Sequence, residues 1–340
     1  MRSASTDRAD SRATSPRDRP FAWALAHATL GVTLALMVVG AATRAARAGV
    51  ACPDWPLCHG HWIPPTHSAA YPANPAYQVY RVYLEFSHRV LAAFVASGGA
   101  MLGIRAWRGR GGGPGGGPTG RRDGPSSDRA LAVGLWIVIA CQVLMGAVTV
   151  WLRNAPFTVV IHLGLAMSFV ALVMTARERF RPTGSAPPAA VGAGFQCATR
   201  AVLGLVVAQM LLGAIVSSKL IGLACFDFPT CNGGIVPPVW TVPIAWQIAH
   251  RALGATVALT AFAVFGAAHL GGGAATERRV SALVLGLVSA QILLGGVTVW
   301  LRIPPAVSAA HLGVATVLLA TLIHTMLRPS SRRSLDSKVK

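Results

Sequence analysis

The sequence predicts an all-α polytopic membrane protein whose eight transmembrane helices form two tandem four-helix bundles related by a pseudo-two-fold axis. The first supporting observation is composition: 53% of the 340 residues are hydrophobic, 12% are charged, and the mean hydropathy is +0.54. A soluble domain typically has about a quarter charged residues, so this composition excludes a water-soluble globular enzyme. The other two observations are a series of long apolar runs and an internal repeat.

The apolar runs set the number of helices. A helix needs roughly 20 mainly apolar residues to cross a hydrocarbon core about 30 Å thick, and the chain contains eight runs of this kind. The runs are continuous, whereas the strands of a membrane barrel would alternate in polarity over about ten residues. In chain order the runs cover residues 22–42, 86–106, 130–151, 157–176, 198–217, 244–267, 280–301 and 306–327.

The basic residues predict how these helices are oriented. Most of the 30 Lys and Arg residues lie in the two tails and in the segments after the second, fourth and sixth runs. The positive-inside rule places these segments, and therefore both termini, on the cytoplasmic side of the cell membrane. Although the net charge is +19, the basic residues are spread between apolar runs and form no single patch for nucleic acid.

The same pattern divides the chain into domains. We expect a four-helix half at 21–177, a cytoplasmic linker at 178–197 and a second four-helix half at 198–327. Residues 1–20 and 328–340 are basic cytoplasmic tails, and the glycine-rich stretch 111–120 is typical of a flexible cytoplasmic linker.

An internal duplication relates the two halves. Residues 142–166 match residues 291–315 at 14 of 25 positions without a gap. Earlier in each half, His88 and Arg89 correspond to His250 and Arg251. Since each half has an even number of helices, the halves run in the same sense through the membrane, and corresponding residues lie at equal depth.

Two pairs of histidines follow this repeat: His88 with His162, and His250 with His311. Each lies near the start of an even-numbered run, which places all four close to the outer face. Zinc would require four ligands, and copper usually has Met or thiolate nearby. A haem requires only two axial ligands and an apolar slot between small-residue helices. The pairs therefore favour one bis-histidine haem site in each half, with zinc or copper as the alternative.

Arg89 and Arg251 directly follow two of these histidines. An arginine at this depth needs an anionic partner, and the propionates of a haem would supply one. The alternative is that both side chains reach the lipid headgroups.

One carboxylate has no counterpart in the repeat. Glu85 lies outside the cytoplasmic segments and the cysteine loops, and it precedes His88 by three residues, which puts both on one helix face. The repeat has Gln247 at this position. We therefore expect chemistry in the N-terminal half and a haem for structure or electron transfer in the C-terminal half. The alternative is a buried ion pair of Glu85 with Arg81 or Arg89.

Two cysteine pairs, Cys52 with Cys58 and Cys225 with Cys231, are expected on the outer, oxidising side, where disulfides persist. Their spacing is compatible with a disulfide-closed turn in each half. A structural clip is the favoured interpretation, and a redox role remains the alternative.

Together these features resemble the haem A synthase family over about residues 22–327. The resemblance implies oxidation of the C8 methyl group of haem O to a formyl group, through successive hydroxylations and loss of water from a geminal diol. The motifs that carry it are the segment from Glu85 to Arg89 (EFSHR), the segment from Cys52 to Cys58 (CPDWPLC), His162, His250, His311 and the eight-helix duplication.

The resemblance also implies roles for individual residues. His88 and His162 would be axial ligands of the substrate haem, Glu85 would act in catalysis, and His250 and His311 would ligate a haem b. The implied partners are a haem O-forming farnesyltransferase, an electron carrier and haem A-containing terminal oxidases, and homo-oligomer formation is left open. The second cysteine pair is absent from some members. The alternative functions are a di-haem b-type electron-transfer cytochrome and a non-catalytic haem carrier.

Overall fold

The structure is a computed structural model, and it describes residues 18–66, 79–109 and 125–331. Eight helices in these ranges are long and apolar enough to cross a membrane, which confirms the predicted polytopic helical protein. Most of both basic tails and the stretch 111–120 lie outside the described residues. The helices are α1 (Asp18–Ala45), α2 (Val79–Arg108), α3 (Pro125–Trp151), α4 (Pro156–Arg179), α5 (Ala193–Ser218), α6 (Val242–Leu270), α7 (Ala275–Trp300) and α8 (Pro305–Met326).

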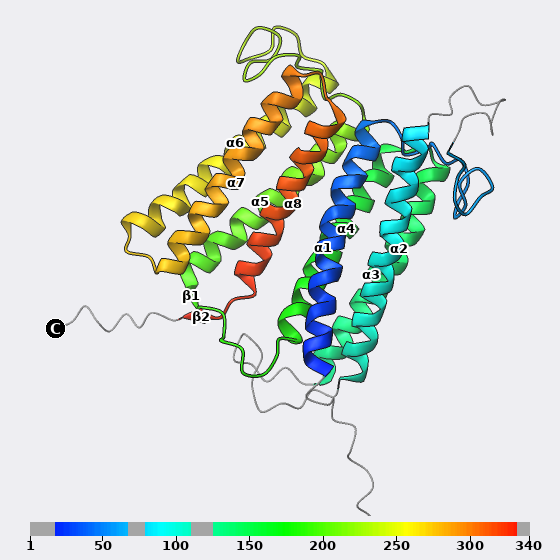
Figure 1. Cartoon of the computed structure of the whole chain (residues 1–340). Coiled ribbons are helices and arrows are strands. Elements are labelled where there is room, and N and C mark those ends of the chain that lie inside the picture. The colour runs from blue at the N-terminus through cyan, green and yellow to red at the C-terminus, as the bar shows by residue number, and fades with distance from the viewer. Residues whose placement is uncertain (1–17, 67–78, 110–124, 332–340) are drawn as a thin grey trace, which may run out of the picture.

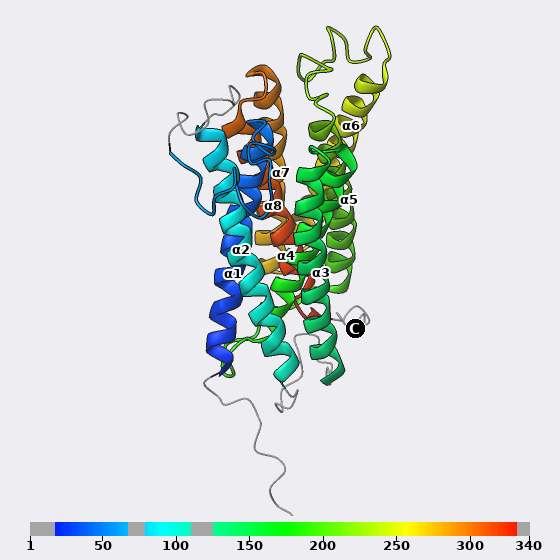
Figure 2. The same ribbon diagram turned by 90° about the vertical axis from the view of Figure 1, so that its right-hand side faces the viewer.

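The same pattern of helix contacts occurs in two sets of four helices, and a further extensive contact, of α1 with α8, joins the sets. Helices α1 to α4 pack against one another in chain order, and α4 returns to α1; helices α5 to α8 repeat this pattern. Figure 1 shows the two sets next to each other, and Figure 2 shows the same arrangement from the side. Between the sets, α1 packs against α8, and α4 packs against α5 and α8.

The largest buried cluster spans the seam between the two sets and extends into the second set. It includes Met37 of α1, Met174 of α4, Val206 of α5 and Leu319 of α8. Lipid tails are as apolar as these side chains, so close packing rather than exclusion of water holds such a seam together.

The turns before α4 and α8 place two of the histidines. Each turn contains two residues with left-handed backbone: Arg153 and Asn154 (φ 51° and 61°), and Arg302 and Ile303 (φ 61° and 63°). The N–H groups of Asn154 and Ile303 donate back into α3 and α7, both at 2.8 Å. A proline then begins each following helix, where its missing N–H costs nothing. The repeated turn puts His162 and His311 in the second turn of their helices.

Two short strands were not predicted by the sequence analysis. Strands β1 (Val191–Gly192) and β2 (Ser330–Ser331) pair in parallel and join the α4–α5 connection to the segment after α8. The side chain of Gln196 adds a hydrogen bond to the carbonyl oxygen of Met326 at 3.2 Å. Strands of two residues are too short to produce the alternation by which a sequence predicts a strand.

Candidate functional site

The four repeated histidines lie on the even-numbered helices, and their rings are buried. The Nδ1 atom of each ring is inaccessible to solvent and has no hydrogen-bond partner among the described residues. His88 lies close enough to His162 to interact with it electrostatically, and His250 does so with His311. The fold therefore brings together the same two pairs that the sequence repeat predicts.

Each imidazole ring lies against a glycine of the preceding helix. A Cβ atom at Gly40 would lie 2.9 Å from Cε1 of His88, and one at Gly213 would lie 3.1 Å from Cε1 of His250. Larger residues at these positions would push the rings away, so the glycines define the space that the rings occupy. The four contacts are Gly40 with His88, Gly146 with His162, Gly213 with His250, and Gly295 with His311.

Glutamines one turn earlier on α3, α5 and α7 also touch the histidines. The Nε2 atom of Gln142 lies 3.4 Å from Nε2 of His162. Gln209 donates to the backbone carbonyl of His250 at 3.0 Å. Sequence reasoning missed these contacts because a repeated Gln-x-Leu-x-Gly pattern is equally typical of close helix packing. The available signal was the recurrence of a glutamine four residues before the glycines Gly146, Gly213 and Gly295.

The described residues contain no group of three or more His, Cys, Asp and Glu side chains placed to hold a metal ion. A structural zinc site is usually built from four such ligands. Paired imidazoles without further ligands suit a haem, which takes two axial ligands from the protein.

Glu85 is 3% exposed and is held by two partners. Its Oε2 atom accepts the backbone N–H of Cys52 at 2.8 Å, and its Oε1 atom forms an ion pair with Arg89 at 2.7 Å. The ion pair considered as the alternative for Glu85 is thus present, and its partner is Arg89. A catalytic role for the same carboxylate remains a prediction.

Arg89 fastens the loop that contains the first disulfide, residues 46–66, which we call the Cys52 loop. Its Nη1 atom donates to the carbonyl oxygens of Asp54 at 2.8 Å and Leu57 at 2.5 Å. Its Nη2 atom donates to the carbonyl oxygen of Cys52 at 3.1 Å and to Glu85. Four of the five guanidinium N–H groups are engaged in this way. Contact of Arg89 with haem propionates remains a prediction.

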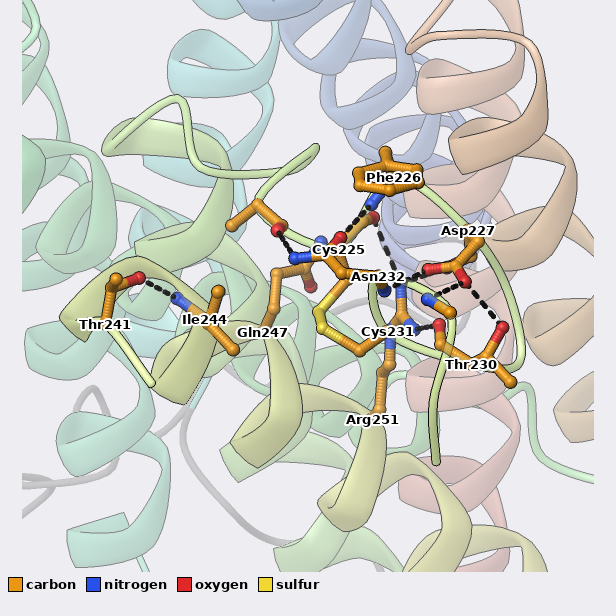
Figure 3. Close-up of a disulfide and its surroundings, with 12 residues drawn as sticks. Cys225, Phe226, Asp227, Thr230, Cys231, Asn232, Thr241, Ile244, Gln247 and Arg251 are labelled. Atoms are coloured by element: carbon orange, nitrogen blue, oxygen red, sulfur yellow. Dashed lines mark hydrogen bonds between the residues drawn. A yellow bond between two sulfur atoms is a disulfide. The ribbon is translucent and has the colours of Figure 1, made fainter. Parts of the chain in front are cut away.

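The second half repeats this arrangement with one change. Arg251 donates to the carbonyl oxygens of Thr230 at 2.5 Å and Asp227 at 2.8 Å, in residues 219–241, the Cys225 loop. Figure 3 shows its side chain directed from α6 toward this loop. At the position of Glu85, the amide of Gln247 donates to the carbonyl oxygen of Gly222. The carboxylate and its ion pair therefore occur in the N-terminal half and a neutral amide occurs in the other.

Both expected disulfides are present. Cys52 and Cys58 are joined with an S–S distance of 2.02 Å, and Cys225 and Cys231 with 2.00 Å (Figure 3). All four cysteines are buried. This burial agrees with a structural clip, and the redox alternative is untested.

An aspartate closes each disulfide loop, and its ionisation is predicted to stabilise the loop. In the Cys225 loop, the Thr230 hydroxyl donates to Asp227 and lowers the pKa of this carboxyl from 3.8 to about 2, against the opposing effect of desolvation. The N–H groups of Asn232 and Gly233 add to this effect, at 2.5 and 2.8 Å. Since the folded-state pKa is depressed, the stabilisation is complete above pH 3.8 and is lost as the pH falls through about 2.

Amide hydrogen exchange of residues 225–234 checks this prediction. After correction for the intrinsic exchange rate, we expect faster exchange at pH 2 than at pH 5, and no such difference in Asp227→Asn. Equal protection of the wild-type loop at both pH values would contradict a role for the carboxylate.

Comparison with known proteins agrees with this geometry. Residues 23–323 match the model of a family described as cytochrome oxidase assembly protein. The haem A synthase of Caulobacter sp. (strain K31) is 30% identical to this chain, over 90% of the chain and 95% of its own length. The haem A synthase of Shewanella oneidensis is 25% identical over 87% and 92%, and that of Bradyrhizobium sp. (strain ORS 278) is 25% identical over 89% and 90%. The chain therefore belongs to the haem A synthase family of cytochrome oxidase assembly proteins.

Proposed function

We propose that this protein is a haem A synthase that oxidises the C8 methyl group of haem O to a formyl group in the membrane. The observation that carries the proposal is the difference between the two otherwise matching sites. Both have paired imidazoles seated on glycines, and the N-terminal one also has the buried carboxylate of Glu85. A carboxylate kept at membrane depth is costly and is functional by default.

The C-terminal pair fits a resident haem b. The buried Nδ1 atoms of His250 and His311 have no protein partner among the described residues, and each ring is seated against a glycine. His250 and His311 would hold the haem, and a haem b bound there would supply a one-electron redox centre. Arg251 fastens the Cys225 loop above this site.

In the N-terminal half, we propose that His88 and His162 orient the substrate haem O. Glu85 accepts a proton at its carboxylate as the methyl group is oxidised. Arg89 holds this carboxylate in place through the 2.7 Å ion pair, and Cys52 holds its second oxygen. The ion pair and the catalytic role are thus compatible, because Arg89 fixes the orientation of the group that reacts.

We further propose that both termini are cytoplasmic and that both sites lie near the outer face. The distribution of basic residues supports this orientation. A farnesyltransferase would supply haem O, and an electron carrier would exchange electrons with the protein. The resemblance to the family supports both partners, and homo-oligomer formation stays a prediction.

Expression in a host that supplies haem O tests the function. The haems are extracted from the purified protein and identified by chromatography with mass detection. We expect haem A or its hydroxylated precursor. Recovery of unmodified haem alone, from a protein with a bis-histidine spectrum, would favour the electron-transfer cytochrome or the haem carrier.

A further inference from the structure

One aromatic side chain fastens the Cys225 loop to the helices beneath it. The ring of Phe228 packs edge to face against Trp300 of α7, with ring centroids 6.1 Å apart and an interplanar angle of 75°. The indole Nε1 of Trp300 donates to the carbonyl oxygen of Phe228 at 3.2 Å. From α6, the guanidinium of Arg251 lies 5.5 Å from the centroid of the same ring. The loop is therefore attached to two different helices at one residue.

A glycine makes room for this ring. A Cβ atom at Gly296 would lie 2.9 Å from Cδ1 of Phe228, closer than carbon atoms approach without displacement. Gly296 directly follows Gly295, the glycine that faces His311, while Arg251 directly follows His250. Phe228 thus contacts Arg251, which is next to His250 in the sequence, and Gly296, which is next to the glycine that faces His311.

The N-terminal half has the matching positions without the matching contacts. The repeat aligns Trp55 with Phe228, Ala147 with Gly296 and Trp151 with Trp300. Trp55 is 40% exposed and has no ring contact among the described residues. Ala147 is 2% exposed and has a methyl group at the position where Gly296 has none. The Cys52 loop is held by Arg89 and Glu85, and the hydroxyl of Tyr83 of α2 donates to the carbonyl oxygen of Pro64 at 2.6 Å. Among the described residues, this loop has no ring contact like that of Phe228 with Trp300.

We propose that the contact of Phe228 with Gly296 and Trp300 is a lock that retains the haem of the C-terminal half, and that the N-terminal half lacks this lock so that its haem exchanges. The inference rests on the proposed function, in which one half keeps its haem and the other releases a product. A haem that leaves past the Cys225 loop must first separate Phe228 from Gly296 and Trp300. Opening of the Cys52 loop breaks hydrogen bonds to Arg89, Glu85 and Tyr83 but, among the described residues, no ring contact of this kind.

Gly296→Ala tests the lock with a minimal change. Its Cβ displaces the Phe228 ring, while alanine favours a helix more than glycine does, so α7 is retained. Haem loss from the purified holoprotein is followed by absorbance with excess apomyoglobin as the acceptor. Since aromatic pairs contribute measurably beyond their buried area, we expect about tenfold faster loss of the low-spin haem from Gly296→Ala and from Phe228→Ala. Trp55→Ala is the matched control and is expected to lose this haem at the wild-type rate.

Amide hydrogen exchange on the same samples measures the loop itself. In Gly296→Ala, we expect faster exchange in residues 225–234 and unchanged exchange in residues 52–61. Faster exchange with unaltered haem loss would overturn the lock, as would unchanged exchange in both variants. A wild-type protein without any low-spin haem would instead contradict the proposed function. In that case, hydrogen exchange of residues 225–234 would still show whether Phe228 fastens the loop.

Discussion

Glu85→Gln is expected to abolish haem A formation while the low-spin haem of the C-terminal half stays in place. Removal of a positioned general base slows proton transfer by about 10²- to 10⁴-fold, which would leave no detectable product. Glutamine is the matched substitution because the repeat has Gln247 at the same position. Its amide oxygen still accepts the N–H of Cys52, so the Cys52 loop keeps this contact. Haem extraction with mass detection measures the product.

The control for this variant is Gln247→Ala, which changes the equivalent position in the other half and is expected to leave haem A formation intact. If Glu85→Gln produced haem A at the wild-type level, Glu85 would serve only as the ion-pair partner of Arg89. A loss of product accompanied by loss of the low-spin haem would indicate a folding defect instead of a catalytic one.

His250→Ala and His311→Ala are each expected to remove the low-spin absorption spectrum of the resident haem. Each substitution removes one of the two imidazoles that we propose hold this haem, and the described residues contain no group of three or more His, Cys, Asp and Glu that would offer a replacement. The spectrum of the purified protein in its reduced and oxidised forms measures this change directly.

His88→Ala and His162→Ala are the matched controls, because they occupy equivalent positions in the N-terminal half. We expect both to retain the resident low-spin haem and to lose haem A formation. An unchanged low-spin spectrum in His250→Ala would refute the assignment of the resident haem to the C-terminal pair.

The sequence predicts most of the fold because a bilayer imposes a simple rule. Each of the eight apolar runs lies within a long helix, with the exception of single residues at the ends of α7 and α8. The histidine pairs were also predictable, since a repeat of even helix number places His88 and His250 at equal depth. The helix positions follow from the apolar runs, and the histidine pairs follow from the internal repeat, and both can be read from the sequence.

The ion pair of Glu85 with Arg89 was one of the alternatives that the sequence offered, but the carbonyl partners of Arg89 in the Cys52 loop were not predicted. Contact of Arg89 with haem propionates stays a prediction, and the structure shows its N–H groups donating to carbonyl oxygens of the Cys52 loop and to the carboxylate of Glu85. Which acceptor an arginine chooses depends on how a loop folds back over a helix end. That path is set by backbone geometry in a loop without hydrophobic periodicity, so no pattern in the residues encodes it.

The contact of α1 with α8 has a consequence for biogenesis. A ribosome releases helices into the membrane in chain order, so the first helix is inserted long before its final neighbour exists. Gly313 of α8 faces Val38 of α1 closely enough that a Cβ there would lie 3.0 Å from its Cγ2 atom. A nascent chain interrupted before α8 therefore leaves this side of α1 facing lipid. Insertion of α8 is therefore the step that gives α1 its last packing partner.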